Sequence, residues 1–189
     1  EALKPEGVAE IISQLRSGSP EAIRGHFSYC AWDPEQQRLY LGRDEFGIRP
    51  MYFTHNEAQG VLAFGTMPED VLLLAGVEKE VSPVAAAISL ALGFIHAPIS
   101  VFQHVQRLLP GQTLKTDSRG EFQTENWPTK SLTPNRELSF EDACKSVRKG
   151  VIEAVDWATA SHDRNGILFS GGLDSTILLA VAKKLLGRE

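Results

Sequence analysis

The spacing of apolar and polar residues divides the chain into short strands and helices. Runs rich in β-branched and aromatic residues, bounded by turn residues, predict strands over residues 26–32, 38–44, 51–55 and 61–66 and a hairpin over residues 114–127. Apolar residues at helical intervals predict helices over residues 8–15, 68–75, 83–93, 140–160 and 176–186. Strands therefore dominate the first part of the chain, and helices dominate the last.

A change of composition separates these two regions. Residues 128–137 hold two prolines and mixed polar residues without periodicity, which is typical of a linker. Ser139, followed by Asp142, then forms the pattern of a capping box at a helix start. A short buried-type strand over residues 166–169, a glycine-rich loop and a second helix follow, and a nucleotide-binding α/β domain begins in this order. We therefore expect one domain over residues 1–127 and the start of another over residues 138–189.

The overall composition narrows the class of protein. The chain is 42% hydrophobic and 23% charged, an ordinary globular mixture, and its net charge of −5 includes no basic block that would indicate a nucleic-acid surface. No apolar run reaches the roughly 18 residues of a membrane-spanning helix, and the first residues lack the pattern of a signal peptide. Cys30 and Cys144 make no disulfide framework, so we expect a cytoplasmic protein in which both are small core residues. The scattered histidines predict no zinc site.

The stretch LFSGGLDST, residues 168–176, carries the clearest chemical signal. Small residues that lead into a helix leave backbone N–H groups free, and with the helix dipole these form an anion site. Two glycines let the main chain approach a phosphate, two serines add hydroxyl donors, and an aspartate there requires Mg²⁺ to bridge it to phosphate oxygens. The candidate residues for binding ATP or pyrophosphate are Ser170, Gly171, Gly172, Leu173, Asp174 and Ser175, with Asp174 acting on the metal indirectly. The structural alternative is a plain glycine turn capped by Asp174 or Ser170.

This string resembles the SGGxDS loop of the ATP pyrophosphatases, the PP-loop enzymes, which cleave ATP between its α and β phosphates. The resemblance implies ATP and Mg²⁺ as cofactors. It also implies that a substrate carboxylate attacks the α-phosphorus while the loop holds the pyrophosphate.

Three further stretches resemble a second family in the right order. Residues 25–33 and 41–53 are similar to the paired strands of class II, N-terminal-nucleophile glutamine amidotransferases, and residues 89–114 to the segment that joins the two halves of glutamine-hydrolysing asparagine synthetases. The fold implied is α+β followed by α/β. Residues 1–127 would be the C-terminal part of an αββα glutaminase domain, and residues 138–189 the first helix, strand, loop and helix of a PP-loop synthetase domain.

The asparagine synthetase resemblance implies an amide-forming ligase of amino-acid biosynthesis. Glutamine would supply ammonia, and a small-molecule carboxylate, aspartate by default, would be activated as an acyl-adenylate with release of pyrophosphate. The implied partners are the remainder of the polypeptide or a partner chain, and a homodimer is left open.

Departures from the family matter as much as the matches. The family's glutaminase nucleophile is a cysteine at the first position of the chain, but residue 1 here is glutamate and the glutamine-binding motifs are absent. We therefore expect no catalytic residue in these 189 residues and no activity of this chain by itself. Asp44 and Gly47 are interpreted as structural, with Asp44 binding backbone donors in a turn. Gly65 and Thr66 replace the family's Ser-Glu pair.

Two alternatives stay open. β-Lactam synthetases and lasso-peptide cyclases resemble asparagine synthetase with an inactive glutaminase half and use a substrate amine instead of ammonia. The chain could also be a non-catalytic fragment or a split subunit. A glutaminase half without its leading strands would expose sheet edges and apolar faces, so it would need partner chains or the rest of its own polypeptide.

Overall fold

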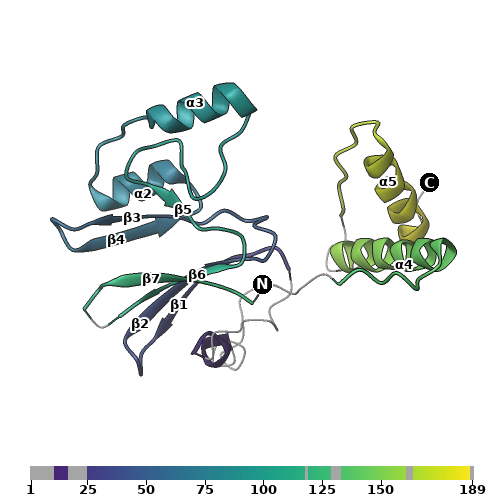
Figure 1. Ribbon diagram of the computed structural model, residues 1–189, viewed down its shortest axis with the longest axis horizontal. Coiled ribbons are helices and arrows are strands. Elements are labelled where there is room, and N and C mark those ends of the chain that lie inside the picture. Colours follow the sequence, from purple (N-terminus) through teal and green to yellow (C-terminus); the bar gives the residue numbers. More distant parts are fainter. Residues whose placement is uncertain (1–10, 17–24, 118, 129–132, 161–163, 188–189) are drawn as a thin grey trace. The chain divides into compact units, whose positions relative to one another are not determined.

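The computed structural model describes residues 11–16, 25–117, 119–128, 133–160 and 164–187 (Figure 1). The chain divides into two compact units, Glu1–Lys130 and Ser131–Glu189, and we describe each unit by itself. The division falls within the segment that the composition marks as a linker. The first three residues of the helix predicted over residues 8–15 lie outside the described residues.

The elements follow the predicted order closely. The strands are β1 (Ser28–Asp33), β2 (Arg38–Arg43), β3 (Tyr52–Asn56), β4 (Val61–Gly65), β5 (Gln106–Arg107), β6 (Gln112–Thr116) and β7 (Phe122–Asn126). The labelled helices are α2 (Pro68–Ala75), α3 (Pro83–Leu92), α4 (Phe140–Thr159) and α5 (Leu173–Leu186). Ser82 caps α3 as predicted, because its hydroxyl accepts the N–H of Ala85 at 3.2 Å.

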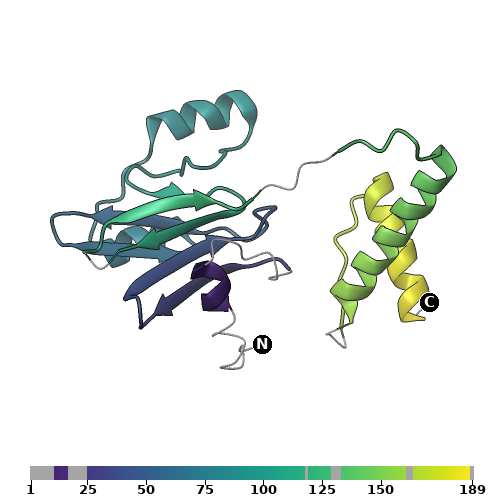
Figure 2. The ribbon, with the colours of Figure 1, turned by 60° about the horizontal axis from the view of Figure 1, so that its bottom comes forward.

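The first unit is built on two antiparallel sheets that face each other (Figures 1 and 2). Sheet A has the strand order β1-β2-β6-β7, and sheet B has the order β4-β3-β5. Leu41 and Leu114 from sheet A pack against Phe53 from sheet B, and all three are buried. This apolar layer between the sheets is the main core of the unit.

Helices cover the outer sides of both sheets. Val71, Leu72 and Ala75 of α2 are buried in a cluster with Ala63 of β4. On the other side, a helical segment over residues 11–16 lies beside β1 and β2, with Leu15 buried (Figure 2). The unit is thus a mixed α and β fold with antiparallel sheets, which agrees with the αββα arrangement that the resemblance implies.

The second unit consists of α4, a loop and α5. Its start confirms the predicted capping box, because Ser139 Oγ accepts the N–H of Asp142 at 3.1 Å. An apolar groove of about 890 Å³ runs between the two helices. In the part of this unit that the structure describes, Val155 and Ala182 are the buried apolar residues.

The strand predicted over residues 166–169 does not form. Residues 165–170 adopt no regular secondary structure, and Leu168 is 98% exposed. A strand needs neighbours for its backbone N–H and C=O groups, and the described residues of this unit supply no partner strand. The second helix also begins at Leu173 instead of Thr176.

The prediction that Cys30 and Cys144 are core residues is wrong, since both side chains are exposed. Cys30 lies on β1, one of the two edge strands of sheet A. Cys144 lines the groove between α4 and α5 and has no further layer over it among the described residues. No helix in the described ranges is long and apolar enough to span a membrane.

Candidate phosphate-binding loop and supporting sites

The loop before α5 has the backbone shape that its glycines predict. Gly171 has φ of +79°, which belongs to the left-handed region that glycine adopts without strain. Gly172 is the N-cap of α5 in an extended conformation, with φ of −75° and ψ of 168°, and it has no side chain that could bond to the first-turn N–H groups. The helix therefore begins with its N–H donors uncapped by a side chain.

Hydroxyl groups converge inside this loop. Ser170 Oγ and Ser175 Oγ lie 3.1 Å apart, and Ser170 Oγ also accepts the N–H of Gly172 at 3.4 Å. The hydroxyl of Thr176 donates to the carbonyl of Gly172 at 2.8 Å, as does that of Ser175 at 3.1 Å. The structure thus brings the two predicted serine donors together at the N-terminal end of α5.

The loop is open to solvent. Residues 170–174 are exposed and Ser175 is half-buried. No described atom lies within 4 Å of the place that a Cβ on Gly171 would occupy. Asp174 stands in the first turn of α5, so its carboxylate adds a negative charge beside the positive end of the helix dipole. The arrangement leaves room for an anion accompanied by a cation, and the loop is not packed shut.

A second predicted feature lies in the first unit, in the turn after β2. The carboxylate of Asp44 accepts the N–H groups of Ile48 and Arg49, each at 3.0 Å, and Gly47 has φ of +64°. Burial acts to raise the pKa of Asp44, but backbone hydrogen bonds, those from Arg49 and Ile48 foremost, together outweigh it and hold the pKa below its usual value. The structural role predicted for Asp44 and Gly47 is confirmed.

Arg43 ties this turn to the segment that follows β5. It is 7% exposed, its Nη1 donates to the carbonyl of Leu108 at 2.8 Å, and its Nε donates to the carbonyl of Arg49 at 2.8 Å. A third bond runs from Nη2 to the carbonyl of Gly47. Burial, followed by the positive charge of Arg107, lowers the pKa of Arg43. All these acceptors are main-chain atoms, so the guanidinium fixes the backbone and is not directed at a ligand site.

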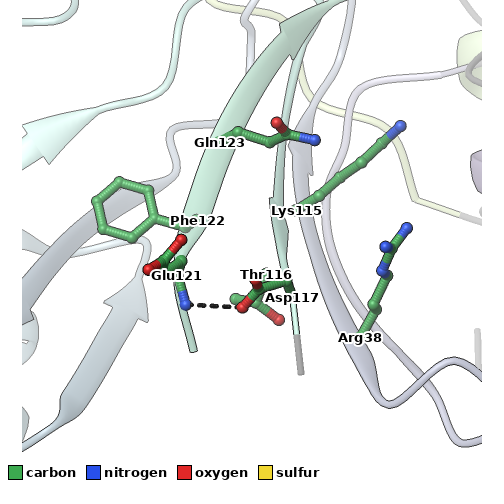
Figure 3. A pocket seen from close by; sticks show the side chains of 7 residues that line it. All are labelled: Arg38, Lys115, Thr116, Asp117, Glu121, Phe122 and Gln123. Carbon is green, nitrogen blue, oxygen red and sulfur yellow. Dashed lines mark hydrogen bonds between the residues drawn. The ribbon is translucent and has the colours of Figure 1, made fainter. Parts of the chain in front are cut away.

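A cavity of about 250 Å³ lies in the first unit beside the β6–β7 turn (Figure 3). Its lining includes charges of both signs, with Arg38 and Lys115 near Asp117 and Glu121 (Figure 3). Asp117 Oδ1 accepts the N–H of Glu121 at 3.0 Å, and Lys115 Nζ lies 2.5 Å from the carboxylate of Glu125. Two of these four charges, Lys115 and Asp117, are thus engaged in contacts within the β6–β7 hairpin.

A buried hydroxyl network in sheet A was not predicted from the sequence. Tyr29 Oη lies 2.7 Å from Thr113 Oγ1, and Trp127 Nε1 donates to the same oxygen at 2.8 Å. The ring of Tyr29 fills the space beside Gly42, which its strand places directly opposite. The only sequence signal is the glycine within a strand pattern, which indicates a close approach of another group. The network joins β1 to the β6–β7 hairpin.

Neither thiol has the setting of an enzymatic nucleophile. Partial burial raises the pKa of the Cys30 thiol, whereas an enzymatic nucleophile needs a lowered one. Cys144 faces the apolar groove of the second unit. Both cysteines lie at the surface and not in a core.

Comparison of the sequence with known proteins shows which family the chain resembles. Residues 6–127 match the model of a glutamine amidotransferase domain. The chain is 26% identical over 86% of its length to glutamine-hydrolysing asparagine synthetase 1 of Bacillus subtilis, covering 25% of that protein. It is 27% identical over 87% of its length to a probable glutamine-hydrolysing asparagine synthetase of Acanthamoeba polyphaga mimivirus, covering 28% of it. A putative glutamine-hydrolysing asparagine synthetase of Methanocaldococcus jannaschii is 23% identical over 95% of the chain, covering 35% of that protein.

The chain thus spans about a quarter to a third of the length of these curated relatives. The family model covers most of the first unit, and the paired sheets of that unit agree with it. The similarity to named asparagine synthetases extends over most of the chain. The chain therefore belongs to the glutamine amidotransferase domain family, as the strand motifs predict.

Proposed function

We propose that this chain is part of an ATP-dependent, amide-forming ligase similar to asparagine synthetase. In the intact enzyme, glutamine supplies ammonia, and a carboxylate, aspartate by default, is activated as an acyl-adenylate with release of pyrophosphate. Support comes from the amidotransferase match over residues 6–127 and from relatives named as glutamine-hydrolysing asparagine synthetases. The observation that supports the proposed binding of ATP is the open SGGLDS loop at the start of α5.

The loop residues fit a pyrophosphate group chemically. The first turn of α5 presents N–H donors and the positive end of its dipole, which together favour a phosphate. Ser170 and Ser175 add hydroxyl donors that already lie 3.1 Å apart. Asp174 would hold Mg²⁺ beside the phosphate oxygens, since a carboxylate repels a bare phosphate. When bound, Mg²⁺ neutralises charge on the leaving pyrophosphate.

The first unit supplies the scaffold of the glutaminase half. The apolar core around Leu41 and Phe53 holds its two sheets together. The side chain of Arg43 fixes the turn after β2 through its hydrogen bonds to main-chain carbonyls, which we call the Arg43 clamp. We assign no catalytic residue within these residues. The isolated 189-residue chain is accordingly expected to hydrolyse no glutamine.

The nucleotide role is tested by Asp174→Asn in the full-length protein that carries this sequence. The measurement is carboxylate-dependent exchange of labelled pyrophosphate into ATP, with aspartate as the first carboxylate. The variant is expected to lose about a hundredfold or more in exchange rate, the usual cost of removing one electrostatic stabiliser. Asp156→Asn, which changes an exposed aspartate on α4, is the matched control and should exchange normally. Exchange by Asp174→Asn at the rate of the control would contradict the proposal.

The nitrogen source is tested separately. Amide formation from ammonium ions by the full-length protein supports an asparagine synthetase-like reaction. Cyclisation of a substrate without any added nitrogen donor would instead favour the β-lactam synthetase or lasso-peptide cyclase alternative. Absence of pyrophosphate exchange, of amide formation and of cyclisation would leave a non-catalytic fragment or subunit as the better description.

A further inference from the structure

Asn165 and Gly166 form a chemically distinctive pair between α4 and the SGGLDS loop. The sequence holds four asparagines, Asn56, Asn126, Asn135 and Asn165, and Asn165 alone precedes a glycine. Glycine has no Cβ to hinder its own backbone nitrogen and adopts a wide range of backbone conformations. The nitrogen of Gly166 can therefore approach the side-chain carbonyl of Asn165 more easily than the nitrogen of any larger residue.

The backbone at this pair is not held in a regular element. Residues 165–170 belong to no helix or strand, and Gly166 is exposed. Apart from its two neighbours in the chain, no described residue has an atom within 4 Å of the place that a Cβ on Gly166 would occupy. By contrast, Asn126 lies within β7, and Asn56 is the last residue of β3, where Asn56 Nδ2 donates to the carbonyl of Ala75 at 2.9 Å. Among these three asparagines, Asn165 is the one with both a glycine neighbour and an irregular backbone.

The side chain of Asn165 also has a structural task. Its Nδ2 donates to the carbonyl of Thr159, the last residue of α4, at 3.3 Å. This bond satisfies one of the carbonyls that every helix leaves unpaired at its C-terminus. A carboxylate in its place has no donor for Thr159 and puts a negative charge at the negative end of the helix dipole.

We propose that Asn165 is a site of spontaneous deamidation that releases the C-terminal cap of α4. The backbone nitrogen of Gly166 attacks Cγ of Asn165, a C–N bond forms, and the side-chain nitrogen leaves as ammonia after taking up the proton of the Gly166 N–H. Water then opens the resulting cyclic imide to aspartate or isoaspartate. No oxidant, metal or enzyme is needed. The product breaks the contact with Thr159 in the segment that leads directly into the SGGLDS loop.

The test follows the chemistry in the native chain and needs no ligase activity, so it stands apart from the proposed function. The full chain is incubated at mildly alkaline pH and digested with trypsin, which releases residues 165–183. This peptide contains no other asparagine and no glutamine, so any mass increase from amide to acid reports on Asn165. We expect steady conversion of this peptide, and conversion several-fold slower in Gly166→Ala. Equal rates in the native chain and in Gly166→Ala would overturn the proposed site.

A second measurement tests the consequence for α4. Asn165→Asp reproduces the main chemical change, and amide hydrogen exchange is measured over the last turn of α4. Exchange there should be several-fold faster than in the unmodified chain, whereas exchange in β3 should not change. Unchanged exchange at the end of α4 would show that Asn165 is not a cap, and this part of the proposal would fail.

Discussion

Gly47→Ala is the sharpest test of how the turn after β2 is held. Gly47 has φ of +64°, and a Cβ added there would lie 2.8 Å from both Arg43 Cζ and Pro110 Cγ. Gly60, in the turn between β3 and β4, has nearly the same φ of +63°, but no described atom lies within 4 Å of its Cβ position. Gly60→Ala is therefore a control with the same backbone conformation and no steric clash.

The expected difference in unfolding free energy between the two variants follows from treating backbone conformation and steric overpacking separately. A non-glycine residue in the left-handed region costs about 1–2 kcal/mol. The lower entropy of the unfolded alanine chain returns about 0.4–1 kcal/mol. Gly60→Ala should thus cost between 0 and about 1.6 kcal/mol by these two values. Gly47→Ala adds overpacking against Arg43 and Pro110, so it should destabilise by about 1–3 kcal/mol more than the control.

Urea unfolding followed by tryptophan fluorescence measures this difference. The variants are made in a Trp157→Phe background, which leaves Trp32 and Trp127, both in the first unit, as reporters. With a slope of about 2 kcal/mol per molar urea, the midpoint of Gly47→Ala should lie about 0.5–1.5 M below that of Gly60→Ala. Equal midpoints would refute the reasoning, because the Arg43 clamp would then tolerate a side chain at Gly47.

Two further predictions concern the same unit. Thr113→Val removes the oxygen shared by Tyr29 and Trp127, so we expect the free energy of unfolding in urea to fall by about 1–3 kcal/mol. Burial raises the pKa of Tyr29 and the bond to Thr113 opposes this rise, so the tyrosine of the variant should ionise at still higher pH in a spectrophotometric titration. A fall in the pKa of Tyr29 would contradict this account. Arg16 forms a bidentate bond to Asp33, and this bond lowers the pKa of Asp33 from 3.8 to about 2. Burial opposes the lowering, and backbone N–H groups assist it. Because the pKa of Asp33 is lower in the folded state, the stability that the ion pair contributes is complete above pH 3.8 and is lost as the pH falls through about 2. Asp33→Asn should therefore flatten the dependence of thermal stability on pH between 3.8 and about 2.

The positions of strands and helices, the helix caps and the turn at Asp44 could largely be predicted from the sequence. The strand and helix positions follow from the period of the apolar residues, and the caps at Ser82 and Ser139 follow from side chains that bond within one turn. The turn at Asp44 is likewise local, since its acceptor and donors lie within five residues of each other. Such interactions need few neighbours and can be predicted from short segments.

The candidate site was predicted in part for the same reason. Gly171 and Gly172 shape the loop through their own backbone freedom, and Ser170 meets Ser175 because both belong to one short loop. Its role in binding a nucleotide stays a prediction. The unpredicted Thr113 network joins residues 84 positions apart in the sequence, Tyr29 and Thr113, which no local pattern reveals.

By itself, the sequence determined the order of the elements, their caps and the conformation of the turns, because these depend on neighbouring residues. The tertiary structure alone decided that β2 pairs with β6, that Cys30 lies at the surface, and that residues 166–169 form no strand. The physical reason is that burial and sheet pairing require a partner segment from elsewhere in the chain. An apolar run predicts that a residue can be buried, and only the presence of that partner determines whether it is.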